Sequence, residues 1–120
     1  MKYKFSGQPD LVRIIRENAD AEAIIVSSPN QHGPLLLLRI TDSEVVALEL
    51  AAHRAVDCCL SNAARPGWEF WEGSGQDLPE GWRAVKFIGS EARRILNALR
   101  ARRELPPCTT VEPIFFPEVA

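Results

Sequence analysis

Two stretches in the first third of the chain are apolar and have the composition of β-strands. Residues 23–28 read Ala-Ile-Ile-Val-Ser-Ser, and residues 34–40 read Pro-Leu-Leu-Leu-Leu-Arg-Ile. Pro29, Asn30 and Gly33 between them favour a turn, so the two stretches are predicted to form a β-hairpin. Neither stretch alternates apolar and polar residues. This pattern is typical of strands at the centre of a sheet, with at least one face covered.

Apolar residues spaced three and four apart predict three helices. The first is expected from Asp10 to about Ala19, the second from about Ser43 to Ala64, and the third from Ser90 to a point before Pro106. Asp42 or Ser43 is expected to cap the second helix, and Ser90 the third. The expected buried positions are Leu11, Ile14 and Ile15 in the first helix, Val45, Leu48, Ala52, Val56 and Cys59 in the second, and Ala92, Ile95, Leu96 and Leu99 in the third.

Four further segments are β-prone, at residues 2–6, 68–71, 82–88 and 109–116. Pro113 lies in the last of these, so residues 106–120 are expected to form either an edge strand or an extended tail. The resulting order is β-α-β-β-α-β-β-α-β. It predicts an α+β fold in a single small domain over residues 1–120, with a mixed or mainly antiparallel sheet and about three helices packed on it.

Composition places the chain among ordinary globular domains. Its 120 residues are 46% hydrophobic and 25% charged, which suits one core that needs no disulfide. No apolar stretch reaches the roughly 18 residues of a membrane span, so no membrane partner is expected. Three cysteines, two of them adjacent, favour a reducing, cytoplasmic location. The 11 arginines against 3 lysines suggest a GC-rich bacterial or phage genome.

The sequence lacks the common catalytic signatures, including phosphate-binding loops and nucleophile elbows. We therefore lean away from an enzyme and expect no cofactor. Glu49, His53 and Asp57 recur every fourth residue and would share one helix face, where they could bind a metal or orient a general base. A solvated polar face explains the same spacing, and we expect no metal. An enzyme or metal protein centred on these three residues stays as a second alternative.

Aromatic and acidic residues gather between positions 68 and 82. Large aromatic side chains beside a charged rim are typical of protein-binding hot spots. Packing of the tryptophans against the helices explains the aromatic residues equally well. The predicted partner-binding residues are Trp68, Trp71, Glu72, Asp77, Glu80 and Trp82.

The third helix is rich in arginine, and arginines on one surface can neutralise successive phosphates. The candidate nucleic-acid contacts are Arg93, Arg94, Arg100, Arg102 and Arg103. Favourable interaction of arginines with the helix C-terminus is the simpler explanation. The net charge of -2 also gives no general attraction to nucleic acid.

These observations favour a non-enzymatic accessory factor that binds another protein through a surface aromatic and acidic loop. A bacterial or phage-encoded inhibitor, immunity protein or counter-defence protein would have this character. The alternative is a nucleic-acid-binding module that uses the arginine-rich third helix.

Overall fold

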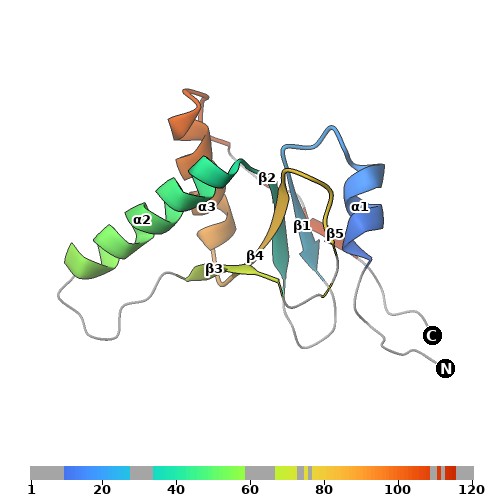
Figure 1. The fold of residues 1–120 in the computed structure, drawn as a ribbon, viewed down its shortest axis with the longest axis horizontal. Coiled ribbons are helices and arrows are strands. Elements are labelled where there is room, and N and C mark those ends of the chain that lie inside the picture. The colour runs from blue at the N-terminus through green and yellow to red at the C-terminus, as the bar shows by residue number, and fades with distance from the viewer. Residues whose placement is uncertain are drawn as a thin grey trace.

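Five strands form one sheet in the order β3-β4-β2-β1-β5, with helices on both faces (Figure 1). The computed structural model describes residues 10–27, 34–58, 67–72, 75, 77–108, 111 and 113–115, without the side chains of 53–58 and 113–115. The strands are β1 (Ala23–Ser27), β2 (Leu35–Arg39), β3 (Trp68–Trp71), β4 (Trp82–Phe87) and β5 (Pro113–Phe115). The helices are α1 (Leu11–Glu17), α2 (Asp42–Cys58) and α3 (Glu91–Arg102).

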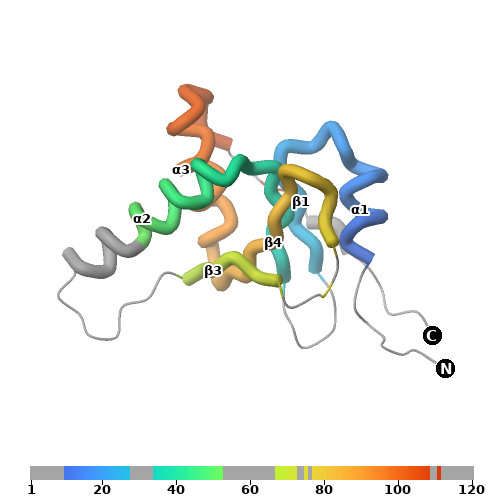
Figure 2. The backbone as a smooth tube through the Cα atoms, in the orientation of Figure 1, coloured from blue at the N-terminus to red at the C-terminus, as the bar shows by residue number. Residues whose placement is uncertain are grey.

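The sheet is antiparallel except at one end. β1 and β2 form the predicted hairpin, in which Ala23 lies opposite Leu38 and Val26 opposite Leu35. β4 pairs antiparallel with the other side of β2, and β3 pairs antiparallel with β4. β5 joins parallel to β1, so Pro113–Phe115 belongs to the sheet as its outermost strand on that side. Figure 2 follows the chain from β2 into α2.

The two faces of the sheet carry separate apolar cores. On one face, α1 contributes Leu11, Ile14 and Ile15 to a cluster with Leu35 and Leu37. On the other face, α2 and α3 contribute Val45, Leu48, Ile95, Leu96 and Leu99 to a cluster with Leu36 and Leu38. Because successive side chains of a strand point to opposite faces, β2 needs an apolar residue at each of its four buried positions, Leu35 to Leu38. This confirms the interpretation of the unbroken leucine run and the α+β class.

The α2 helix begins one residue before the predicted start and has a different cap. Glu44 N–H donates to Thr41 Oγ1 at 3.2 Å, and Thr41 N–H donates to Glu44 Oε1 at 3.0 Å. This reciprocal capping box satisfies two backbone donors, so the prediction that Asp42 or Ser43 caps α2 was wrong. The described part of α2 ends at Cys58, and the predicted continuation to Ala64 lies outside the described residues.

The other two helices largely follow their predictions. Asp10 caps α1 by accepting a hydrogen bond from Arg13 N–H at 3.1 Å, and the helix ends at Glu17. In α3 the four predicted apolar positions are buried. Ser90 occupies the N-cap position of α3, but its side chain makes no capping hydrogen bond.

The predicted strand at residues 2–6 and the buried positions expected at Val56 and Cys59 lie outside the described residues or side chains. Among the described helices, none has the length and apolar character needed to cross a bilayer.

Candidate functional site

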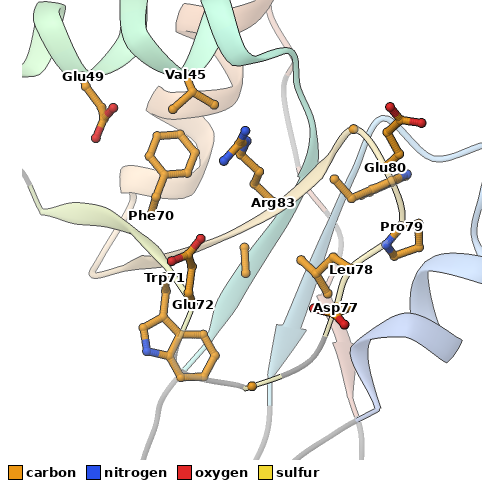
Figure 3. Close-up of a pocket in the computed structure, with 14 residues that line it drawn as sticks. Val45, Glu49, Phe70, Trp71, Glu72, Asp77, Leu78, Pro79, Glu80 and Arg83 are labelled. Carbon is orange, nitrogen blue, oxygen red and sulfur yellow. The ribbon is translucent and has the colours of Figure 1, made fainter.

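An open groove of about 740 Å³ lies beside α2 and the β3 and β4 strands (Figure 3). Val45 and Glu49 of α2 point toward Phe70 of β3. The rest of the lining comes from Trp71, from the segment between β3 and β4, and from the first residues of β4. The groove therefore joins a helix to a hairpin that follows it in the sequence.

Strand alternation divides the aromatic residues between the two cores. Trp68 and Phe70 pack on the α2 and α3 side, with ring centroids 5.4 Å apart in an edge-to-face arrangement. Trp71 and Trp82 pack against the α1 side. Trp71 therefore faces opposite to Trp68. All three tryptophans are half-buried, so each combines packing with a contact area still open to solvent.

Two cations lie over the tryptophan rings at this site. Lys86 Nζ lies 5.6 Å from the centroid of the Trp71 ring, and Arg39 Cζ lies 5.5 Å from that of Trp82. A cation over an indole face is attracted by the ring quadrupole and favours one ring orientation. These contacts hold the rings of Trp71 and Trp82 in one orientation.

The charges that line the groove are mostly negative. Four exposed carboxylates take part, namely Glu49, Glu72, Asp77 and Glu80. Arg83 is the cation of the lining, and it forms an ion pair with Asp42 at the start of α2. Because Asp42 already balances Arg83, the groove presents a surplus of negative charge to solvent.

Backbone hydrogen bonds anchor the end of the segment that enters β4. Gly81 has φ +86°, a conformation that glycine adopts without steric cost. Its carbonyl accepts from Ile40 N–H at 2.7 Å, and Trp82 N–H donates to Pro79 O at 3.1 Å. Residues 77–81, which lead into β4, are thus tied to the sheet beside β2. This attachment holds Glu80 at the rim of the groove.

Five of the six predicted partner-binding residues line this groove, and their role in binding stays a prediction. Trp71, Glu72, Asp77, Glu80 and Trp82 all line the groove. Trp68 does not line it and instead supports Phe70 from the core side. Val45, Glu49, Phe70 and Arg83 were missed as members of the site. Local sequence gave no signal for Val45 and Glu49, because α2 and β3 meet only in the folded chain, whereas Phe70 and Arg83 directly adjoin predicted residues.

Glu49 belongs with His53 and Asp57 to the second alternative, a metal or catalytic centre, and the structure places it beside Phe70. The side chains of His53 and Asp57 lie outside the described residues, so their relation to Glu49 stays a prediction. Among the side chains that the structure describes, no group of three or more His, Cys, Asp or Glu residues is arranged to hold a metal ion.

The arginines of α3 differ in exposure, and three of them form ion pairs with carboxylates. Arg100 Nη1 donates to Glu22 Oε1 at 2.7 Å, and Arg103 Nε donates to Glu44 Oε2 at 2.8 Å. Arg94 pairs with Glu91 at 3.1 Å. Of the five candidate arginines, Arg93, Arg94 and Arg102 are exposed. The two pairs on Arg100 and Arg103 tie α3 to the start of β1 and of α2.

The Glu44 pair predicts an acid-sensitive contribution to stability. Hydrogen bonds from Arg103 lower the pKa of Glu44 from 4.5 to about 2, assisted by Thr41 and opposed by burial. A lowered folded-state pKa stabilises the fold above about pH 4.5, and this contribution is lost as the pH falls toward about 2. Urea unfolding of Glu44→Gln across this range should show a variant that is destabilised near neutral pH and converges on the wild type in acid.

Glu17→Gln is the matched control, because Glu17 forms an exposed ion pair with Arg13. Exposed pairs contribute little, so this variant should follow the wild type at every pH. A constant difference between Glu44→Gln and the wild type from pH 7 to pH 2 would contradict the role assigned to the Glu44 charge.

No protein-family model, curated protein or solved structure matches this chain.

Proposed function

We propose that this chain is a non-enzymatic protein-binding factor whose groove receives a basic segment of a partner protein. The observation that carries the proposal is the combination of exposed carboxylates and oriented aromatic rings around one open groove. The partner-binding residues are Trp71, Glu72, Asp77, Glu80 and Trp82 from the hairpin, joined by Glu49 and Phe70.

The aromatic side chains supply the binding energy in this proposal. Trp71 and Trp82 offer large rigid areas that lose little conformational entropy on binding. The carboxylates at the rim act mainly on encounter, because long-range attraction raises the association rate of an oppositely charged partner. A surface in which aromatic side chains supply affinity and carboxylates speed association suits a small cytoplasmic inhibitor, immunity protein or counter-defence protein of a bacterium or phage.

Binding of nucleic acid through α3 has less support. A phosphate-binding surface needs several cations on one face. Arg100 and Arg103 already have carboxylate partners, and the acidic groove adds repulsion toward phosphates.

Affinity capture with a matched pair of charge variants tests the proposal. Glu72→Lys with Glu80→Lys reverses charge in the groove, and Glu17→Lys with Asp20→Lys makes the same net change at and just after α1. Wild type and the α1 variant should capture the same protein from a bacterial lysate, as identified by mass spectrometry. The groove variant should lose it.

Two results would contradict the proposal. One is a groove variant that captures the same protein as the wild type. The other is salt-sensitive copurification of DNA or RNA that depends on Arg93 and Arg94, which would promote α3 to the functional surface.

A further inference from the structure

On the basis of the proposed function, we infer that the basic segment binds as an added β-strand along the outer side of β3. β3 is the outermost strand on its side of the described sheet, and its last two residues line the groove. A peptide that extends a sheet gains main-chain hydrogen bonds, while its alternate side chains enter the flanking pockets.

The pairing of β3 with β4 determines which backbone groups of β3 point outward and can bind an added strand. Ile88 N–H donates to Gly67 O at 2.9 Å, and the register places Glu69 opposite Lys86 and Trp71 opposite Ala84. Residues of an antiparallel pair alternate between facing the partner strand and facing away. Counting from Gly67, the N–H and C=O groups of Trp68 and Phe70 point away from β4. No strand within the described sheet pairs with that side of β3.

The two flanks of β3 indicate what the added strand should contain. On the α2 side, an incoming side chain meets Phe70, Val45 and the carboxylate of Glu49. On the opposite side it meets Trp71 and the exposed Glu69, where Lys86 lies over the Trp71 ring and opposite Glu69 in the register. The α2 flank thus offers an aromatic ring and a carboxylate for a basic side chain, and the Trp71 flank offers an apolar ring whose nearby carboxylate already faces a lysine. A segment with Lys or Arg on one face and apolar residues on the other complements the two flanks.

A second copy of this chain is a poor occupant of the same edge. Two β3 strands pairing antiparallel about Glu69 along their outer sides would place the two Glu69 side chains directly opposite each other. Like charges across neighbouring strands are destabilising. The charge of the edge therefore favours a basic partner over self-association.

The test uses a displayed library of random peptides selected on the wild-type protein. Enriched peptides should carry Lys or Arg among apolar residues, and the strongest binder is then synthesised with two patterns of backbone N-methylation. Methyl groups on one alternate set of residues remove the N–H groups that face β3. The other set places its methyl groups on the side facing away, which makes it the matched control.

One methylated pattern should bind at least about tenfold more weakly than the parent peptide, and the other within about threefold, since each lost hydrogen bond costs about 1 kcal/mol. Equal binding by both patterns would overturn the added strand. If the Glu72→Lys, Glu80→Lys variant nevertheless failed to bind the peptide, the proposed function would stand without the added strand. Enrichment of acidic peptides, or of peptides that bind the groove variant equally well, would overturn both.

Discussion

Replacing Leu48 with alanine is expected to lower the free energy of unfolding by about 2–5 kcal/mol. Leu48 is 5% exposed and packs in the core between α2, α3 and the sheet. Truncation removes apolar burial and leaves a cavity that the rigid sheet beneath cannot fill. The loss is a large share of the roughly 5–15 kcal/mol that stabilises a typical small domain.

Leu50 provides the matched control on the same helix, because its side chain is 51% exposed. Leu50→Ala should change stability by less than about 0.5 kcal/mol, as surface substitutions usually do. Urea unfolding followed by circular dichroism measures both variants. Equal losses at the two positions would show that the buried face of α2 has been assigned incorrectly.

Much of the fold was predictable because local pattern and tertiary packing agree. The leucine run of β2 required cover on both faces, and α1 on one side with α2 and α3 on the other supplies it. The apolar stripe of α3 predicted its buried residues without error. The cap of α2 was equally readable as Thr-x-x-Glu from Thr41 to Glu44. The error arose because Asp42 and Ser43 are also good capping residues.

The site was harder to predict because its parts are distant in the sequence. The hairpin residues of the groove form one aromatic and acidic cluster along the chain, so composition found them. The wall formed by Val45 and Glu49 depends on how α2 packs over β3. The same holds for the arginines of α3, since Arg100 pairs with Glu22 across 78 positions and Arg103 with Glu44 across 59. Helical spacing alone gives no account of such partners.

Trp71→Ala is expected to have the largest effect on binding. The side chain lines the groove, packs against the α1 core, and has Lys86 over its ring. Loss of a central aromatic anchor typically costs about 2 kcal/mol or more, which is roughly thirtyfold in affinity. The loss should appear as faster dissociation. Trp71→Phe keeps an aromatic face and should lose less.

Glu80→Gln is expected to act differently, because Glu80 lies exposed at the rim. Removing a rim charge mainly slows association, and the difference from wild type should fade as salt screens the field. The two variants should therefore differ in which rate constant they change.

Surface plasmon resonance with the captured partner, at low and high salt, tests the central claim most directly. Circular dichroism and thermal unfolding first establish that each variant is folded. We predict faster dissociation for Trp71→Ala at both salt concentrations, and slower association for Glu80→Gln at low salt only. A folded Trp71→Ala protein that binds with wild-type rate constants would contradict the assignment of this groove as the recognition surface.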